Sequence, residues 1–155
     1  MLTTLGNLRI LDIGIYFAGP YASRILADLG ADVIKLEAPA GDTLRPTTKP
    51  FNAAARGKRS IAVDLKTSEG REIGLRLAER CDVMSHNMRP GVVERLGMDY
   101  DNVRAVNPAV IYVYAPGWGA TGPESDRPGF APLFSGLVGL QYELSLIHIS
   151  EPTRQ

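Results

Sequence analysis

The sequence has few of the residues that build disulfides and metal centres. Only one of the 155 residues is cysteine and two are histidine, and no H-E-x-x-H or paired C-x-x-C motif is present, so the sequence predicts neither an internal disulfide nor a metal site. The 17 basic and 17 acidic residues cancel, which leaves no overall field to attract nucleic acid or an anionic membrane. Any site for an anion must therefore be local.

Long apolar segments are also missing. No run approaches the length of a membrane span, and the N-terminus lacks the basic, apolar and small-residue pattern of a secretion signal. Hydrophobic residues make up 45% and charged residues 22% of the chain, as in globular domains. With its lone cysteine the sequence predicts a cytoplasmic protein without membrane or nucleic-acid partners.

Strand and helix patterns alternate along most of the chain. Short apolar runs closed by turn residues are separated by stretches in which apolar residues recur at helical spacing. Successive βαβ units predict an α/β fold with a mainly parallel sheet. The expected strands are 8–14, 32–37, 60–65, 82–87 and 109–115, and the expected helices are 20–29, 67–81, 90–97, 100–106 and 130–142, with a long loop at 38–59 that holds one helical turn near 52–55.

Local signals define the ends of two of these helices. Pro20 suits a first helical position and Gly30 a C-terminal cap, whereas Thr67 suits an N-cap. On the helix after Thr67, the apolar spacing predicts that Ile73, Leu77, Ala78 and Cys81 face the core.

Three loops follow expected strands, where open α/β sheets bind their ligands. In the first, 12–20, Gly14 and Gly19 precede a helix whose backbone N–H groups could meet a phosphate, but a plain strand-to-helix turn is favoured because bulky residues separate the glycines. The second, 56–66, carries four cations around a strand, and a solvated charge run is the favoured interpretation. The third loop is 86–97.

Within this third loop, two arginines have two equally good interpretations. Arg89 and Arg95 could form a fork for phosphate, or Arg95 could simply offset the negative end of its helix. Asn87 lies between the strand end and Arg89. Spacing alone therefore predicts an anion-binding α/β domain and names no reaction.

Three further residues have unremarkable interpretations. Cys81 closes an apolar helix face, so packing is favoured over nucleophilic chemistry. His86 has no second ligand at metal spacing, which favours a structural role. Trp118, between two glycines, either covers a pocket or anchors its loop.

The three loops together carry a family resemblance. The stretches A-G-P, A-D-V-I-K-x-E, K-R-S-x-x-x-D-L-K and N-x-R-P-G occur in this order between Leu8 and Gly139. In this combination the sequence resembles the N-terminal part of the class III CoA-transferases, a family that also contains alpha-methylacyl-CoA racemase. The resemblance implies a Rossmann-like large domain, a smaller second domain and a homodimer of interlocked chains.

The resemblance also implies a site for coenzyme A. By position, Phe17 and Ala18 would line the CoA and Val63–Lys66 would meet its adenosine end, while Asn87–Arg89 and Arg95 would hold its phosphates. Some relatives place an arginine against CoA where this chain has Ala38, a role that Arg45 could take over. The implied cofactor-binding residues are Phe17, Ala18, Val63, Asp64, Leu65, Lys66, Asn87, Met88, Arg89 and Arg95.

The implied reaction moves CoA between an acyl-CoA thioester and a carboxylic acid through an aspartyl-CoA intermediate. The racemases of the family use a histidine and an aspartate instead, and Phe130 occupies the histidine position here, which disfavours that alternative. The nucleophilic aspartate is expected beyond the chain end, so no catalytic residue is assigned and the chain is expected to be inactive alone. A non-catalytic nucleotide-binding fragment is the third alternative.

The last twelve residues differ from the rest. Leu144 to Arg154 matches the translation of a transposon end and adapter used in sequencing libraries. We therefore expect residues 1–143 to be the native, truncated part of the CoA-binding domain and 144–155 to be an adapter-derived tail.

Overall fold

The computed structural model describes residues 4–140, which fall into two compact units that divide after Pro116. The predicted adapter tail lies outside the described residues, as do the last two positions of the predicted helix 130–142. The first unit contains β1 (Arg9–Asp12), α1 (Ala18–Asp28), β2 (Asp32–Glu37), α2 (Thr48–Ala55), β3 (Arg59–Ala62), α3 (Ser68–Glu79), β4 (Val83–His86), α4 (Val92–Arg95), α5 (Tyr100–Val106) and β5 (Ile111–Tyr114), and the second contains α6 (Ala131–Leu137).

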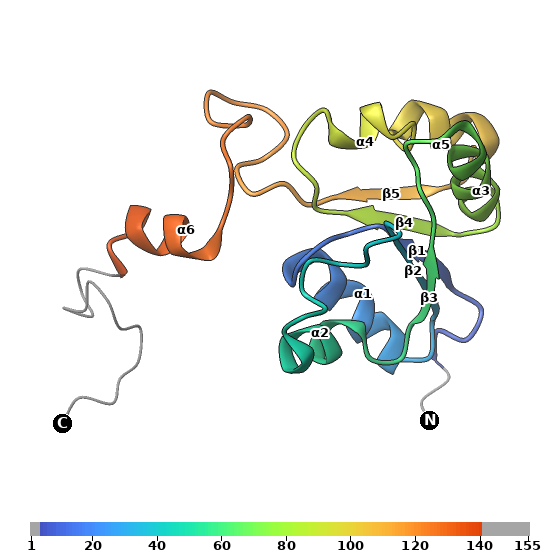
Figure 1. The fold of residues 1–155 in the computed structure, drawn as a ribbon, viewed down its shortest axis with the longest axis horizontal. Coiled ribbons are helices and arrows are strands. Elements are labelled where there is room, and N and C mark those ends of the chain that lie inside the picture. Colours follow the sequence, from blue (N-terminus) through green and yellow to red (C-terminus); the bar gives the residue numbers. More distant parts are fainter. Residues whose placement is uncertain (1–3, 141–155) are drawn as a thin grey trace. The chain divides into compact units, whose positions relative to one another are not determined.

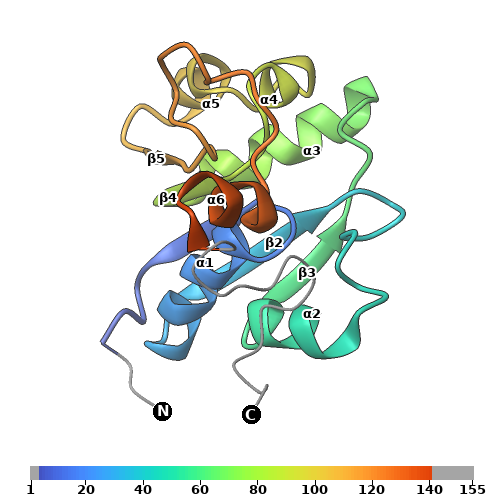
Figure 2. The same cartoon turned by 90° about the vertical axis from the view of Figure 1, so that its left-hand side faces the viewer.

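The first unit is a parallel sheet between two layers of helices. Its five strands pair in the order β3-β2-β1-β4-β5, and every pairing is parallel. Helices α1 and α2 cover one face, and α3, α4 and α5 cover the other (Figures 1 and 2). This confirms the predicted α/β fold, and the order is that of the first five strands of the doubly wound dinucleotide-binding fold.

Each face of the sheet has its own apolar core. The larger core lies beneath α3, α4 and α5 and the smaller one beneath α1. The β1 side chains alternate between them, with Ile10 in the smaller core and Leu11 in the larger, as a strand buried on both faces requires. The larger core consists of Leu11, Ile13, Leu36, Val63, Leu65, Ala78, Cys81, Met84, Val93, Met98 and Val103.

The capping predictions are confirmed where a side chain or a glycine carries them. Thr67 Oγ1 accepts a hydrogen bond from Gly70 N at 3.0 Å and begins α3. Gly30 follows α1 with a φ of 102°, the left-handed conformation that glycine adopts without strain. Helix α1 starts at Ala18, so Pro20 is its third residue, which a proline in the first turn permits.

Other element bounds differ from the prediction. The helix predicted near 52–55 begins earlier and spans eight residues, Thr48–Ala55. Pro50 lies in its first turn, where a helix tolerates proline. The strand predicted at 60–65 ends at Ala62. Beyond it, Val63 and Leu65 remain buried in the core although they lie outside the strand. The predicted buried strand is therefore a largely exposed edge strand, and the buried side chains of the run, Val63 and Leu65, follow it.

The predicted core face of α3 is wrong at one position. Ile73 is 41% exposed, whereas Gly70 and Gly74 are buried. A Cβ on Gly70 would lie only 1.9 Å from Asp64 O, and one on Gly74 would lie 2.8 Å from Leu65 Cδ2. The helix approaches the segment after β3 through its glycines, which a search for apolar side chains does not detect.

The second unit is a glycine-rich loop followed by α6. The indole N–H of Trp118 donates to Pro128 O at 3.1 Å, and the ring packs on Phe134 at 4.7 Å between centroids. Of the two interpretations of Trp118, the structure therefore favours the anchor of a loop. Among the residues that the structure describes, no helix has both the length and the apolar character to cross a bilayer.

Candidate functional site at the carboxyl ends of the strands

The sheet has one point where its strand order reverses direction. From β1 the chain builds outward to β2 and β3, and it then crosses to β4 and β5 on the other side of β1. Ligands of open α/β sheets bind at such a switch point, beyond the carboxyl ends of the strands. The loops that follow β1 and β4 therefore define the candidate site, and these are the first and third loops singled out by the sequence.

Asn87 joins these two loops through the backbone of Ile15. Its Oδ1 accepts from Ile15 N and its Nδ2 donates to Ile15 O, both at 2.9 Å. Both glycines of the first loop make room for this contact, since a Cβ on Gly19 would lie 2.9 Å from Asn87 Cγ and one on Gly14 would lie 3.1 Å from its Oδ1. The glycines thus admit the Asn87 side chain, a role that spacing along the chain could not reveal.

Gly14 is held from both sides as well. Its N–H donates to Asp12 Oδ1 at 2.8 Å, and its carbonyl accepts from Lys35 Nζ at 2.8 Å. The polar backbone groups of Gly14 and Ile15 are therefore all bonded to side chains. Their N–H groups do not face a ligand, and the segment Gly14–Ile15, which we call the arch, is fixed before any ligand arrives.

Two buried ion pairs hold Asp12 and Lys35, the side chains that bind Gly14. Lys58 Nζ lies 2.7 Å from Asp12 Oδ2 and also donates to Ser23 Oγ at 2.9 Å. Lys35 Nζ lies 2.8 Å from Asp42 Oδ2. The solvated charge run predicted for 56–66 is thus wrong for Lys58, which is buried, while Arg56 and Arg59 are exposed in ion pairs with Asp28 and Asp32.

Arg45 is occupied by an acid of the same loop. Its Nε and Nη2 each lie 2.6 Å from an oxygen of Glu37, and its guanidinium stacks on Phe51. Although burial opposes the charge, these bonds and those from Ser60 and Asp42 lower the pKa of Glu37 to about 2. Arg45 therefore closes the loop after β2 and has two of its three nitrogens committed to Glu37.

Aromatic side chains follow the arch in the sequence. Tyr16 has a φ of 60°, which is strained for a residue with a side chain. Phe17 is the N-cap residue of α1 and stacks on Tyr21 at 5.0 Å between centroids. All three are partly exposed, so the predicted ligand contact Phe17 is accessible. Ala18, the first residue of α1, is exposed too.

The predicted adenosine segment alternates in exposure. The side chains of Val63 and Leu65 are buried in the core, and those of Asp64 and Lys66 are exposed. A ligand at this place would therefore meet Asp64, Lys66 and the backbone, but not the two apolar side chains. This segment follows β3 and belongs to the same carboxyl edge of the sheet as the arch.

Arg95 bends back along its helix. A Cβ on Gly91 would lie 3.1 Å from Arg95 Nη1, so the guanidinium lies over the beginning of α4 and not at its end. The phosphate fork of Arg89 and Arg95 stays a prediction.

His86 and Cys81 have structural surroundings. His86 is 2% exposed and stacks on Tyr114 at 4.6 Å between centroids, and its Nδ1 accepts from Met88 N at 3.3 Å. Burial lowers the pKa of His86 to about 4, so the ring is neutral near pH 7. Burial also raises the pKa of the Cys81 thiol to about 11, which makes it a poor nucleophile.

Two hollows lie elsewhere on the first unit. One of about 320 Å³ is lined by Thr4–Leu8 and Asp82, and another of about 240 Å³ includes Arg9, Asp32 and Arg59. Both lie at the amino ends of the strands, the opposite edge from the arch. Within residues 4–140 no three His, Cys, Asp or Glu side chains are grouped to hold a metal ion.

The fold defines the class as a doubly wound α/β protein whose candidate site lies at the carboxyl edge of its sheet. A family profile for CoA-transferase family III matches residues 5–145, and the chain belongs to this family. It is 36% identical over 146 residues to the succinyl-CoA--D-citramalate CoA-transferase of Chloroflexus aurantiacus and 40% identical over 147 residues to the succinyl-CoA:glutarate CoA-transferase of Mus musculus. A CaiB/BaiF family protein from Brucella suis has a similar structure, with a TM-score of 0.86 and 36% identity.

The chain spans only part of these relatives. The alignments cover 88% and 89% of this chain but 36% and 34% of the two transferases. The structural match covers 100% of this chain and 43% of the Brucella protein.

Proposed function

We propose that this chain binds coenzyme A at the carboxyl edge of its sheet, as part of a CoA-transferase that moves CoA between an acyl-CoA thioester and a carboxylic acid. The observation that carries the proposal is that the loops after β1 and β4, joined by Asn87 at the arch, place the folded-back guanidinium of Arg95 on the same carboxyl edge of the sheet. CoA carries a diphosphate and a phosphomonoester, and such groups are bound by guanidinium forks and helix N-termini. Membership of the family supports the same ligand.

Each predicted ligand residue has a role in this proposal. Phe17 offers its exposed ring, and Ala18, at the first position of α1, offers an N–H that has no acceptor within the helix. Asp64 and Lys66 meet the adenosine end, together with the backbone of Val63 and Leu65. Arg89 and Arg95 hold the diphosphate. Asn87 positions the arch, and Met88 lies in the turn between Asn87 and Arg89.

The transfer itself would use a carboxylate nucleophile. An aspartate attacks the thioester carbonyl, CoA thiolate leaves, and the thiolate then attacks the resulting anhydride to give an aspartyl-CoA thioester and the free acid. The carboxylic acid acceptor reverses these steps and leaves as the new acyl-CoA. We infer this route, an interlocked homodimer and a cytoplasmic location from the resemblance. Phe130, the N-cap of α6, has no proton to exchange and disfavours the racemase alternative.

The first prediction concerns CoA affinity. Arg95→Met should weaken CoA binding to the chain by roughly 10- to 100-fold, because a hydrogen bond to a charged group contributes about 1.5–3 kcal/mol. Titration calorimetry with CoA at constant ionic strength measures the change. Arg80→Met is the matched control, since exposed Arg80 follows α3 at the opposite edge of the sheet.

The proposal fails if the unmodified chain does not bind CoA, or if Arg80→Met and Arg95→Met weaken binding equally. The transfer step is tested separately on the protein from the complete source gene. Incubation with an acyl-CoA should yield a covalent CoA adduct on an aspartate, found by peptide mass spectrometry. A protein that exchanges acyl groups without such an adduct contradicts the aspartyl-CoA route.

A further inference from the structure

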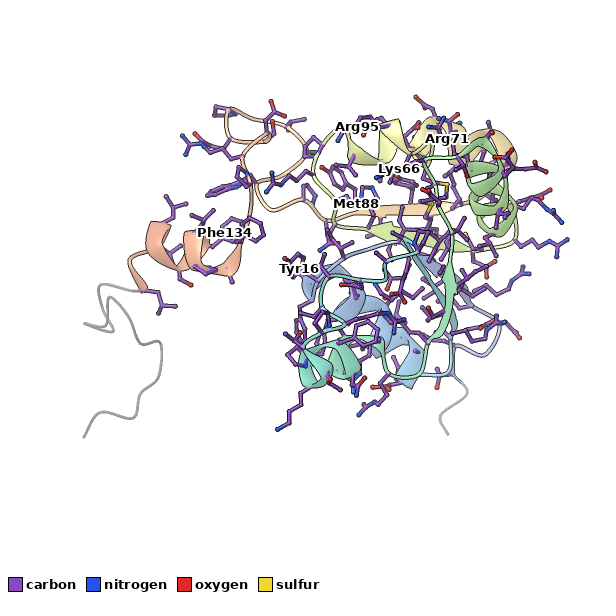
Figure 3. All side chains as sticks on the ribbon, viewed as in Figure 1. Tyr16, Lys66, Arg71, Met88, Arg95 and Phe134 are labelled. Atoms are coloured by element: carbon purple, nitrogen blue, oxygen red, sulfur yellow. The ribbon has the colours of Figure 1, made fainter. Side chains whose placement is uncertain are left out.

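A small pocket at the amino ends of the strands combines an apolar floor with a rim of arginines. Its volume is about 240 Å³, and it lies against the first residues of β1, β2 and β3 and the end of α3. Tyr16 and Met88, which follow β1 and β4, mark the carboxyl edge of the sheet in Figure 3. The pocket is at the opposite ends of the strands and is therefore separate from the proposed CoA site.

The strand register places charged and apolar side chains on the same face of the sheet. Arg9 pairs with Asp32, and Ile34 pairs with Arg59. Residues that are paired, or two apart along a strand, share one face, so these side chains stand beside Leu11 and on the side of the larger core. Leu11 is 1% exposed and Ile34 is partly buried against the same core. The pocket thus has charged groups directly next to its apolar floor.

The arginines of the rim outnumber the acids that pair with them. Arg59 binds both carboxylate oxygens of Asp32 through Nε and Nη2, and Arg9 Nε lies 3.7 Å from Asp82 Oδ2. Arg80 also lines the pocket, and its guanidinium has no hydrogen bond or ion pair with any residue in 4–140. One positive charge at the rim is therefore left without an acid.

The end of α3 does not cancel this charge. Free carbonyls at the end of a helix would repel an anion, but Ala78 O and Cys81 O accept from Asn107 Nδ2 at 2.9 and 2.7 Å. The carbonyl of Leu77 accepts from Arg80 N at 3.1 Å. Because these acceptors are satisfied within the protein, the guanidinium of Arg80 stays available to a ligand.

We propose that this pocket binds a small carboxylic acid, with its hydrocarbon chain on the apolar floor and its carboxylate bound by Arg80 and Arg59. The bonds of Arg59 to Asp32 leave the N–H groups of its Nη1 for the ligand, and guanidinium groups match the geometry of a carboxylate. Sites for drug-sized ligands measure about 300–1,000 Å³, so this smaller pocket suits a chain of about six carbons. The ligand would bind at the edge away from the proposed chemistry, which is the arrangement of an effector site and does not depend on the proposed function.

Hexanoate is the probe, and amide NMR shifts of the ¹⁵N-labelled chain measure its dissociation constant. We expect saturable shifts around Leu11, Ile34 and Arg80. Hexanoate should bind roughly tenfold more tightly than butyrate, because each buried CH₂ strengthens binding about fourfold. It should also bind roughly tenfold more tightly than hexanol, which lacks the charge.

Two variants separate recognition of the charge from a general loss of affinity. Arg80→Met should remove most of the preference for hexanoate over hexanol, and Arg80→Lys should restore part of it. Arg104→Met is the matched control, because Arg104 is exposed in the last turn of α5 and its loss removes the same charge. This variant should keep the preference.

The outcomes also separate this site from the proposed function, since the titrations contain no CoA. A chain that gives no saturable shifts with hexanoate, or only shifts at the carboxyl edge, overturns the inference and leaves the CoA proposal standing. Equal affinities for hexanoate and hexanol, or a preference that Arg80→Met leaves intact, overturn it too. A chain that binds hexanoate as expected but does not bind CoA contradicts the proposed function alone.

Discussion

A Lys58→Met substitution should lower the free energy of unfolding of the first unit by about 3–5 kcal/mol, the usual cost of removing one partner of a buried ion pair. The side chains of Lys58 and Asp12 are 1% and 0% exposed, and their charged atoms are 2.7 Å apart. Burial lowers the pKa of Lys58, and the charge of Asp12 opposes this. Methionine has a similar volume, but it leaves the carboxylate of Asp12 buried without a cation.

Urea titration followed by far-ultraviolet circular dichroism measures this loss. Fluorescence would not suffice, because Trp118 is in the second unit. The double variant Asp12→Asn/Lys58→Met should recover most of the lost stability, since replacing both charges removes the cost of an unpaired one. Arg59→Met, which breaks an exposed ion pair with Asp32, is the control and should cost less than about 1 kcal/mol. Equal losses for Lys58→Met and Arg59→Met would contradict a stabilising role of the buried pair.

Local sequence signals predicted most of the fold. The N-cap Thr67, the left-handed Gly30 and the helix Tyr100–Val106 follow from a few neighbouring residues each. The parallel sheet followed from the alternation of strands and helices. Such features depend on interactions within one turn or one strand, which are visible in a single stretch of sequence.

The parts that were not predicted depend on partners far away in the chain. Lys58 belongs to a run of cations, and it is buried because its ammonium group pairs with Asp12, which is 46 residues away in the sequence. Likewise, positions 14 and 19 require glycine because the side chain of Asn87, 72 residues from Ile15 in the sequence, occupies the space that a Cβ would fill. The core face of α3 was misassigned for a related reason, because its closest approach to the segment after β3 is made by glycines. Residue type and spacing do not specify these contacts.

These distant contacts also explain how the candidate site is prepared. Asn87, Asp12 and Lys35 bond every polar backbone group of the arch, and Arg71 donates to two backbone carbonyls, one after β3 and one at the end of α4. A ligand that binds at this edge therefore loses little free energy to ordering the loops. The buried charges, which cost stability when unpaired, are thus used to position the backbone.

Acidification from pH 7 to pH 4 should destabilise the first unit through His86. The folded-state pKa of His86 is about 4, because the ring is buried, and the unfolded value is 6.5. Between these values the unfolded chain binds the proton and the folded chain does not, so stability falls as the pH falls. A pKa difference of one corresponds to about 1.4 kcal/mol, so the loss is about 3 kcal/mol by pH 4. The charge of Glu94 slightly favours the protonated form and is too weak to offset the burial.

His86→Asn should remove most of this pH dependence. Asparagine does not titrate, and its Oδ1 can replace Nδ1 as the acceptor for Met88 N. The free energy of unfolding of this variant should stay nearly constant from pH 6.5 to about pH 4.5, below which the loss of the Glu37–Arg45 pair begins, since Glu37 titrates between its unfolded value of 4.5 and its folded value of about 2. His148→Asn, which alters the second histidine of the chain, is the control and should retain the pH dependence of the parent. An imidazole of His86 that titrates near pH 6.5 in the folded protein, followed by NMR, would show that its burial does not control acid stability.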